Sequence, residues 1–109
     1  MTLNSYQKGA LETAIYPEEH KIIYPALGIN GEAGEVAEKV KKILRGDSVL
    51  TEARKADIAY ELGDVLWYAA TLAHDLGYTL EDIAKMNLKK LKMRQKKGLL
   101  AGDGDHRGE

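Results

Sequence analysis

The chain has 109 residues, 44% of them hydrophobic, a formal net charge of −1 and no cysteine, which suits one globular domain and excludes disulfides, thiolate zinc sites and a cysteine nucleophile. Its charges are mixed along the chain, so no global field indicates binding to nucleic acid or to anionic lipid. The longest nearly apolar segment, residues 65–73, is far too short to cross a bilayer and no secretory signal precedes it, so we expect a cytoplasmic protein without membrane contact.

Helical periodicity runs through most of the sequence. Four segments repeat apolar residues every three or four positions, and none alternates with the period of two that a half-buried strand shows, so we expect an all-α, four-helix bundle. The first predicted helix covers residues 4–16 and stops before Pro17. The second runs from Pro25 to Arg45 and is ended by Gly46.

The third predicted helix, residues 52–76, is the longest and the most apolar, which indicates the central helix of the bundle. Gly77 is expected to end it. Thr79 and Asp82 then form a capping-box pattern that starts a fourth helix, and this helix fades near Lys97.

Residues 1–98 are therefore predicted to form one domain, followed by a glycine-rich, polar and flexible tail over residues 99–109. A domain of this size buries only about 60–68% of its unfolded surface, so apolar stripes that its own helices leave uncovered would pack against another subunit. We accordingly expect a homo-oligomer.

Two acidic pairs form the candidate site. GEAGEVAE places Glu32 and Glu35 three residues apart on one face of the second predicted helix, and ELGD places Glu61 and Asp64 at the same spacing on the third. An antiparallel return of the chain lets the two pairs face each other. Gathered carboxylates repel one another unless a cation neutralises them, and oxygen ligands suit Mg²⁺ or Mn²⁺ rather than zinc or copper. The sequence therefore predicts a divalent metal site.

Glycines gather around the acidic pairs, although each costs a helix about 1 kcal/mol relative to alanine. They are Gly28, Gly31, Gly34 and Gly63. Close packing of backbones, or room for a ligand beside the acids, would compensate for that cost. A lone Glu-x-x-Glu is usually a solvated helix face, and it is the combination with the glycines that favours a metal site.

Basic residues follow the acids along the second predicted helix. Lys39 and Lys42 continue the acidic face, and Arg45 lies nearby. These side chains could balance the negative charge of a polyphosphate that the cations bridge. The alternative is ordinary helix chemistry, because basic residues near a helix C-terminus complement the macrodipole and Glu35 with Lys39 is a common i,i+4 pair.

The fourth predicted helix carries Asn87, Lys90 and Arg94 beside its apolar stripe. The amide of Asn87 could read a sugar or a base edge, and Lys90 and Arg94 could bind phosphates. An inter-helix hydrogen bond is the alternative for Asn87. The surrounding basic run lies at a helix C-terminus, which argues against a nucleic-acid site.

Aromatic residues follow the second acidic pair by about one turn. Trp67 or Tyr68 could stack on a nucleobase above the metal site, while core packing is expected for at least one of them. The three histidines show no metal-ligand spacing, and His20 is the one placed near the candidate site.

The segments GEAGEVAEKVKK and ELGDVLWY, followed by N-x-x-K-L-x-x-R from Asn87, resemble the MazG-like nucleotide pyrophosphohydrolases. The lead-in LNSYQKGALETAIYP resembles short, single-domain members found in phages, so the likeness covers residues 3–98. It implies a carboxylate quartet that binds Mg²⁺, hydrolysis of a (deoxy)nucleoside triphosphate to the monophosphate and pyrophosphate, and a dimer or tetramer. Glu38 extends the first motif as an assisting acid or base, and the quartet falls on Glu32, Glu35, Glu61 and Asp64.

The implied reaction is attack of a water molecule on the α-phosphorus, with pyrophosphate as the leaving group. Glu35 would orient or deprotonate that water. A non-catalytic helical adaptor, whose acidic face binds a basic partner, is the second function that the residues allow. A carboxylate-bridged iron protein is disfavoured, because no histidine lies three residues after any of the four acids.

Overall fold

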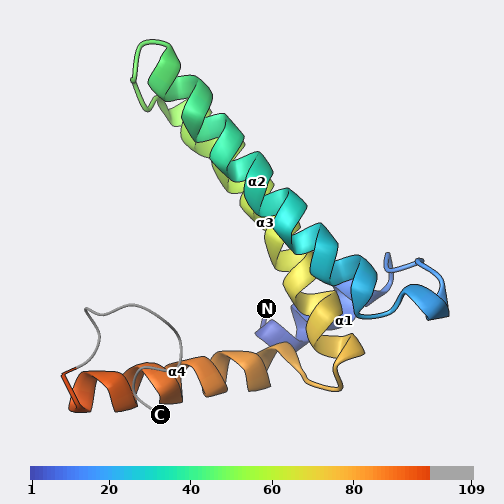
Figure 1. Ribbon diagram of the computed structural model, residues 1–109. Coiled ribbons are helices and arrows are strands. Elements are labelled where there is room, and N and C mark those ends of the chain that lie inside the picture. The colour runs from blue at the N-terminus through green and yellow to red at the C-terminus, as the bar shows by residue number, and fades with distance from the viewer. Residues whose placement is uncertain (99–109) are drawn as a thin grey trace.

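The fold consists of helices joined by short connections, and it confirms the predicted all-α class (Figure 1). The computed structural model describes residues 1–98, so the expected tail over residues 99–109 lies outside the described residues. None of the helices in the described part combines the length and the apolarity that a membrane span requires. In chain order the helices are α1 (Leu3–Leu11), the 3₁₀ helix η1 (Glu18–His20), α2 (Ile23–Arg45), α3 (Glu52–Asp75) and α4 (Leu80–Lys96).

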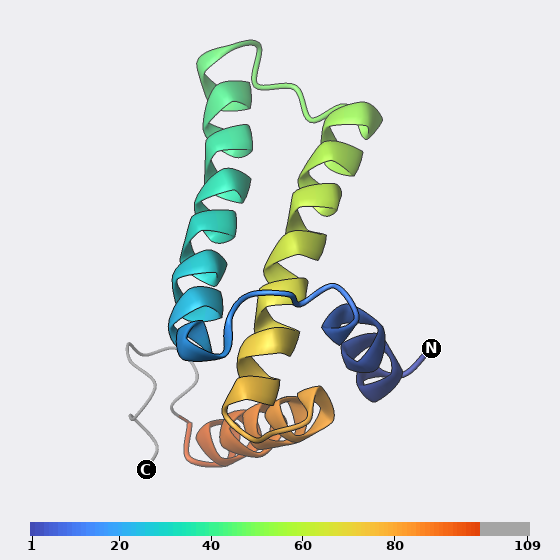
Figure 2. The ribbon, with the colours of Figure 1, turned by 90° about the vertical axis from the view of Figure 1, so that its right-hand side faces the viewer.

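Helices α2 and α3 form a long antiparallel hairpin, and they lie side by side in both views (Figure 2). As predicted, α2 stops at Gly46, whose N–H donates to Lys42 O at 3.1 Å. The left-handed residue of the turn is Ser48, with φ 58°, rather than the glycine. Thr51 then caps α3 by accepting from the N–H of Arg54 at 3.2 Å. This short turn is what brings the acidic pair of α3 back beside that of α2.

The first helix is shorter than predicted, because α1 ends at Leu11 and not near Tyr16. The carbonyl of Ala10 accepts from the Thr13 hydroxyl at 2.9 Å and from the indole N–H of Trp67 at 3.2 Å. A hydrogen bond from a side-chain hydroxyl to a backbone carbonyl competes with the backbone hydrogen bonds that would continue the helix. The periodicity over residues 12–16 therefore did not indicate helix, and this part of the prediction was wrong.

The buried core is small and lies where α1, α3 and α4 meet. Ala10, Ala70 and Leu80 form its centre, and Tyr6 and Trp67 pack against them. These residues belong to three helices, which meet at the end of the hairpin opposite the α2–α3 turn (Figure 1). The hairpin itself, which extends beyond this core, keeps large apolar side chains at its surface.

Gln7 joins the three helices of the core through a side chain that is only 6% exposed. Its amide nitrogen donates to Ala70 O at 3.0 Å and to Tyr78 O at 3.2 Å, while its oxygen accepts from the N–H of Leu80 at 3.0 Å. A buried backbone group without a hydrogen-bond partner costs about 1–3 kcal/mol. The side-chain amide of Gln7 avoids this cost at three backbone groups. This network fixes α1 against the α3–α4 connection.

Helix α4 leaves the end of α3 at a steep angle and runs away from the hairpin (Figures 1 and 2). Gly77, with φ 88°, ends α3 as predicted, and Tyr78 N–H donates to Ala73 O at 2.9 Å. The predicted capping box is also present, because Thr79 and Asp82 exchange side-chain to backbone hydrogen bonds. The main contacts of α4 within the described chain are with α1 and α3.

Candidate metal centre

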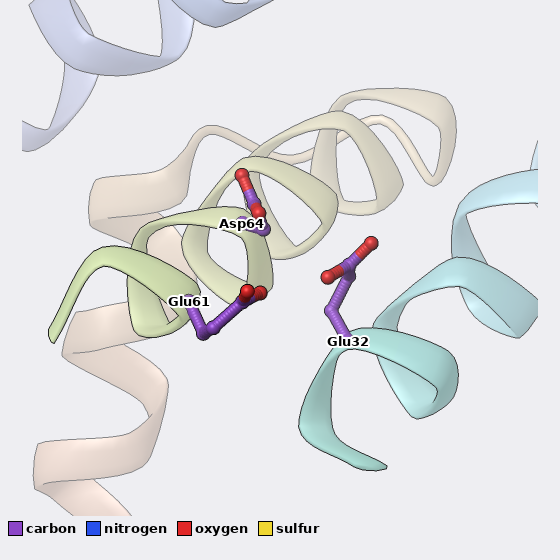
Figure 3. Close-up of side chains that lie close together, drawn as sticks. All are labelled: Glu32, Glu61 and Asp64. Atoms are coloured by element: carbon purple, nitrogen blue, oxygen red, sulfur yellow. The ribbon is translucent and has the colours of Figure 1, made fainter. Parts of the chain in front are cut away.

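Three of the four predicted metal ligands converge between α2 and α3. Glu32 projects from α2 toward Glu61 and Asp64 of α3, and one carboxylate oxygen from each lies within 4.8 Å of the others (Figure 3). Glu32 and Glu61 are half-buried, and Asp64 is exposed. The i,i+3 spacing of the α3 pair puts both of its acids on the face that meets α2. We refer to these three residues as the carboxylate cluster.

The carboxylate cluster carries unbalanced negative charge. Partial desolvation raises the pKa of Glu32, and the charges of Asp64, Glu61 and Glu35 raise it further. Among residues 1–98, the basic side chain that forms an ion pair with the cluster is Lys39, whose Nζ lies 3.9 Å from Glu61 Oε1. Three oxygen donors that repel one another fit a small, hard divalent cation, which would relieve the repulsion.

Glu35 and Glu38 lie outside the carboxylate cluster. Glu35 is exposed, and its charge acts on Glu32 from one turn away along α2. Glu38 instead pairs with Lys41 at 2.8 Å, and this hydrogen bond, together with the charges of Lys41, Lys42 and Arg45, holds the pKa of Glu38 below its usual value. Lys42 and Arg45 thus act on Glu38, whereas Lys39 is the predicted phosphate ligand that lies beside the cluster.

Tyr68 borders the carboxylate cluster and packs over α2 at Gly28. Burial raises the pKa of its hydroxyl, and a hydrogen bond with Tyr24 and the charges of Glu32 and Asp64 raise it further. Space for the ring exists because residue 28 has no Cβ atom. Close packing therefore explains Gly28, whereas a Cβ atom at any of Gly31, Gly34 and Gly63 would meet nothing within 4 Å.

Gly28→Ala is expected to destabilise the protein, whereas Gly31→Ala is expected to stabilise it. A Cβ atom at residue 28 would lie 2.5 Å from Cζ of Tyr68, so the ring must move, at a cost of roughly 1–3 kcal/mol. Alanine at residue 31 meets open space and adds about 1 kcal/mol of helix propensity. Thermal unfolding of both variants checks the pair. Equal melting temperatures of the two variants would show that the ring of Tyr68 does not require the absence of a Cβ atom at residue 28.

Trp67 points the other way, toward α1. Its indole N–H donates to Thr13 Oγ1 at 2.9 Å and to Ala10 O at 3.2 Å, and its ring meets Tyr68 edge-on at 4.9 Å. Core packing, the alternative considered for one of the two aromatics, therefore describes Trp67. Its ring also lines a cavity of about 300 Å³ together with Thr13, Ile15, Tyr16, Pro17, His20 and Tyr24.

Tyr16 and Tyr24 were missed by the sequence reasoning. Their rings stack at 5.1 Å with an angle of 22° between the planes, and Tyr24 reaches Tyr68 at 6.2 Å. Each stands next to a proline in sequence, Tyr16 before Pro17 and Tyr24 before Pro25. An aromatic residue directly before each of the two prolines of the chain was the signal that could have identified them.

The predicted nucleotide-binding residues of α4 lie apart from the carboxylate cluster in the single chain. Asn87, Lys90 and Arg94 line a hollow of about 480 Å³ on α4, shared with Ile83 and Met86. Because α4 diverges from the hairpin, the chain does not bring these three residues to its own α2 and α3 carboxylates (Figure 1).

Comparison with known proteins identifies the family of the chain. The family model described as the MazG nucleotide pyrophosphohydrolase domain matches residues 21–99, which include all four predicted metal ligands. The Gene 37 protein of Mycobacterium phage L5 is 44% identical over 114 residues, which cover 98% of this chain and 100% of that protein. No solved structure matches the chain. Because this family model covers most of the chain, the chain belongs to the MazG nucleotide pyrophosphohydrolase family.

Proposed function

We propose that this protein hydrolyses a nucleoside or deoxynucleoside triphosphate to the monophosphate and pyrophosphate, with Mg²⁺ or Mn²⁺ as cofactor. The observation that carries the proposal is the convergence of Glu32, Glu61 and Asp64 within 4.8 Å in a chain of this family. An all-oxygen donor set is the one that these cations prefer. We also propose that the protein acts in the cytoplasm, as part of nucleotide metabolism.

The residues of the carboxylate cluster would bind the cation, and Glu35 would act as the general base for the attacking water. A bound divalent cation would neutralise phosphate charge and make a neighbouring water more acidic. Glu35 lies one turn from Glu32, is exposed and stands outside the carboxylate cluster. It would accept the proton of the attacking water while the bond from the α-phosphorus to the bridging oxygen breaks and pyrophosphate leaves.

Lys39 is the basic residue best placed to bind a phosphate. Its Nζ lies 3.9 Å from Glu61, and it could turn to a phosphate oxygen once Glu61 binds a cation. Lys42 and Arg45 would contact the far end of the polyphosphate, and Glu38, whose lowered pKa keeps it ionised, would assist as a base. Tyr68 borders the cluster and would stack on the base, with Trp67 fixing the orientation of its ring.

We further propose that the protein works as a homo-oligomer, a dimer or a tetramer. Within residues 1–98 the buried hydrophobic residues are three alanines and Leu80, while Leu27 is 71%, Leu62 57% and Met86 54% exposed. Such apolar surface on three helices is typical of chains that pack against a second copy. A partner's α4 laid across the acidic hairpin would bring Asn87, Lys90 and Arg94 to the nucleotide, and its basic charge complements the hairpin.

Identification of the products tests the function directly. The protein would be incubated with the common ribo- and deoxynucleoside triphosphates and Mg²⁺, Mn²⁺ or EDTA, and the products separated by ion-exchange chromatography. We expect equal amounts of monophosphate and pyrophosphate, and none in EDTA. The adaptor alternative predicts no product from any nucleotide and a melting temperature that Mg²⁺ with nucleotide leaves unchanged.

Metal binding is expected to weaken as the pH falls from about 7 to about 5, because protons compete with the cation for carboxylates. The pKa of Glu32 is raised, so this competition begins at a higher pH than for an isolated glutamate. The stability of the metal-free protein should change in the opposite direction and rise as the pH falls, because protonation of Glu32 relieves repulsion and favours the folded state. Calorimetric titration with Mn²⁺, and metal-free melting curves, over this pH range would check both. An affinity that is constant over the range would contradict the expected proton competition.

A further inference from the structure

Asp75, the last residue of α3, anchors the connection between α1 and α2. Its Oδ2 accepts from the hydroxyl of Tyr16 at 2.8 Å and from the backbone N–H of Ile22 at 2.9 Å. Tyr16 lies near the middle of this connection, residues 12–22, and Ile22 is its last residue. One carboxylate oxygen therefore holds both parts of an irregular segment to the end of the central helix.

The backbone at Ile22 needs such an anchor. Ile22 has φ 69° and ψ −55°, and the N–H of Ile23 donates to Lys21 O at 2.7 Å, which makes a γ-turn of the strained kind. Positive φ is costly for a β-branched residue and persists only where surrounding contacts hold it. Because α2 begins at the next residue, this turn sets the direction in which α2 and Tyr24 start.

A line of aromatic rings leads from Asp75 to the carboxylate cluster. Tyr16 stacks on Tyr24 at 5.1 Å, and Tyr24 reaches Tyr68, whose hydroxyl senses the charges of Glu32 and Asp64. Burial and the hydrogen bond to Asp75 raise the pKa of Tyr16 to about 12. The Tyr16 hydroxyl therefore remains a donor to Asp75 across the neutral range.

We infer that Asp75 is a positioning residue for the nucleobase: by holding Tyr16 and the turn at Ile22, it fixes the aromatic cavity that Tyr16, His20, Tyr24 and Trp67 line beside Tyr68. The volume of about 300 Å³ lies at the small end of ligand pockets, which suits a base rather than a whole nucleotide. The inference rests on the proposed function, because it takes the nucleotide as the ligand. Asp75 itself touches neither the cation nor the phosphates in this scheme.

Tryptic cleavage after Lys21 tests the anchor independently of any activity. Asp75→Ala removes both hydrogen bonds, and we expect cleavage at this bond to be about tenfold faster, since local opening governs proteolysis of a folded chain. Asp75→Asn keeps an acceptor oxygen and should restore much of the protection. Glu19→Ala, which removes an exposed carboxylate from the same segment, serves as the matched control. Unchanged cleavage in Asp75→Ala would overturn the anchor.

Kinetics and binding test the positioning role. In Asp75→Ala we expect KM for the nucleoside triphosphate to rise about fivefold or more, because a loosened cavity must be ordered by the substrate. The kcat should stay within about twofold and Mn²⁺ affinity should not change, since the cluster is untouched. Tyr16→Phe keeps the ring and loses one hydrogen bond, so it should give a smaller rise in KM and guards against a misfolded alanine variant.

The outcomes separate this inference from the proposed function. Faster cleavage with unchanged KM would overturn the positioning role, and so would an equal fall in kcat and Mn²⁺ affinity. If the wild-type protein is inactive, nucleotide affinity measured by the fluorescence of Trp67, the single tryptophan, takes the place of KM. An inactive wild type that still binds nucleotide more tightly than Asp75→Ala would sink the proposed function and keep the positioning role. A wild type that binds no nucleotide overturns the role.

Discussion

Asp64→Asn is expected to abolish pyrophosphate release while raising the melting temperature of the metal-free protein. The change keeps the volume of the side chain and removes one of three charges that lie within 4.8 Å. Loss of a proposed metal ligand should lower kcat/KM about a hundredfold or more, because the proposed cation would supply most of the charge stabilisation. The metal-free fold should gain stability, because the repulsion that raises the pKa of Glu32 is reduced.

Opposite changes in activity and stability distinguish this prediction from simple unfolding. Glu52→Gln is the matched control, because Glu52 is an exposed carboxylate on the same helix that pairs with Lys55 at 3.1 Å. An exposed ion pair of this kind contributes little, so activity and melting temperature should stay close to wild type. Full pyrophosphate release in Asp64→Asn would contradict the metal centre.

Glu35→Gln would separate proton transfer from metal binding. Glu35 lies outside the carboxylate cluster, so this variant should lose activity while binding Mn²⁺ with nearly the wild-type affinity. A loss of Mn²⁺ affinity as large as that of Asp64→Asn would instead place Glu35 among the ligands. Calorimetric titration of both variants with Mn²⁺ at one pH provides the comparison.

Gln7→Glu is expected to be strongly destabilising, although it replaces one nitrogen atom by oxygen. The new carboxylate would face the carbonyls of Ala70 and Tyr78, to which Gln7 now donates, in a site only 6% exposed. Two lost donors and a buried charge cost about 3 kcal/mol or more, which lowers the melting temperature of a domain of this size by roughly 10–20 °C. Urea or thermal unfolding would measure the loss.

The pH dependence of the Gln7→Glu variant identifies its cause. Burial and the two carbonyls should raise the pKa of the new carboxyl, because its protonated form can donate one hydrogen bond. The variant is then nearest to wild type at low pH and loses stability as the pH rises through that raised pKa. Gln95→Glu, an exposed change on α4, should alter stability by less than about 0.5 kcal/mol. Equal effects at both positions would mean that the Gln7 network contributes nothing.

Local sequence determined the helices and the spacing of the acids. Helical period places Glu61 and Asp64 on one face regardless of the rest of the chain. The C-terminal ends of α2 and α3 and the capping box of α4 were predicted correctly, because caps depend on residues within a few positions of the helix end, whereas α2 begins at Ile23, two residues before the predicted Pro25. The end of α1 was predicted incorrectly, because the Ala10 carbonyl at this end accepts a hydrogen bond from Trp67, which lies 57 residues away in sequence.

Only the tertiary structure decided which of these groups meet. Trp67 and Tyr68 are adjacent in sequence, yet Trp67 bonds to Ala10 of α1 and Tyr68 borders the carboxylate cluster. Asp75 and Gln7 gave no motif, because their partners lie 53 to 73 residues away. Periodicity fixes the direction of a side chain around its own helix axis. The angles at which helices cross, and hence what each side chain meets, depend on packing and on the connections between helices.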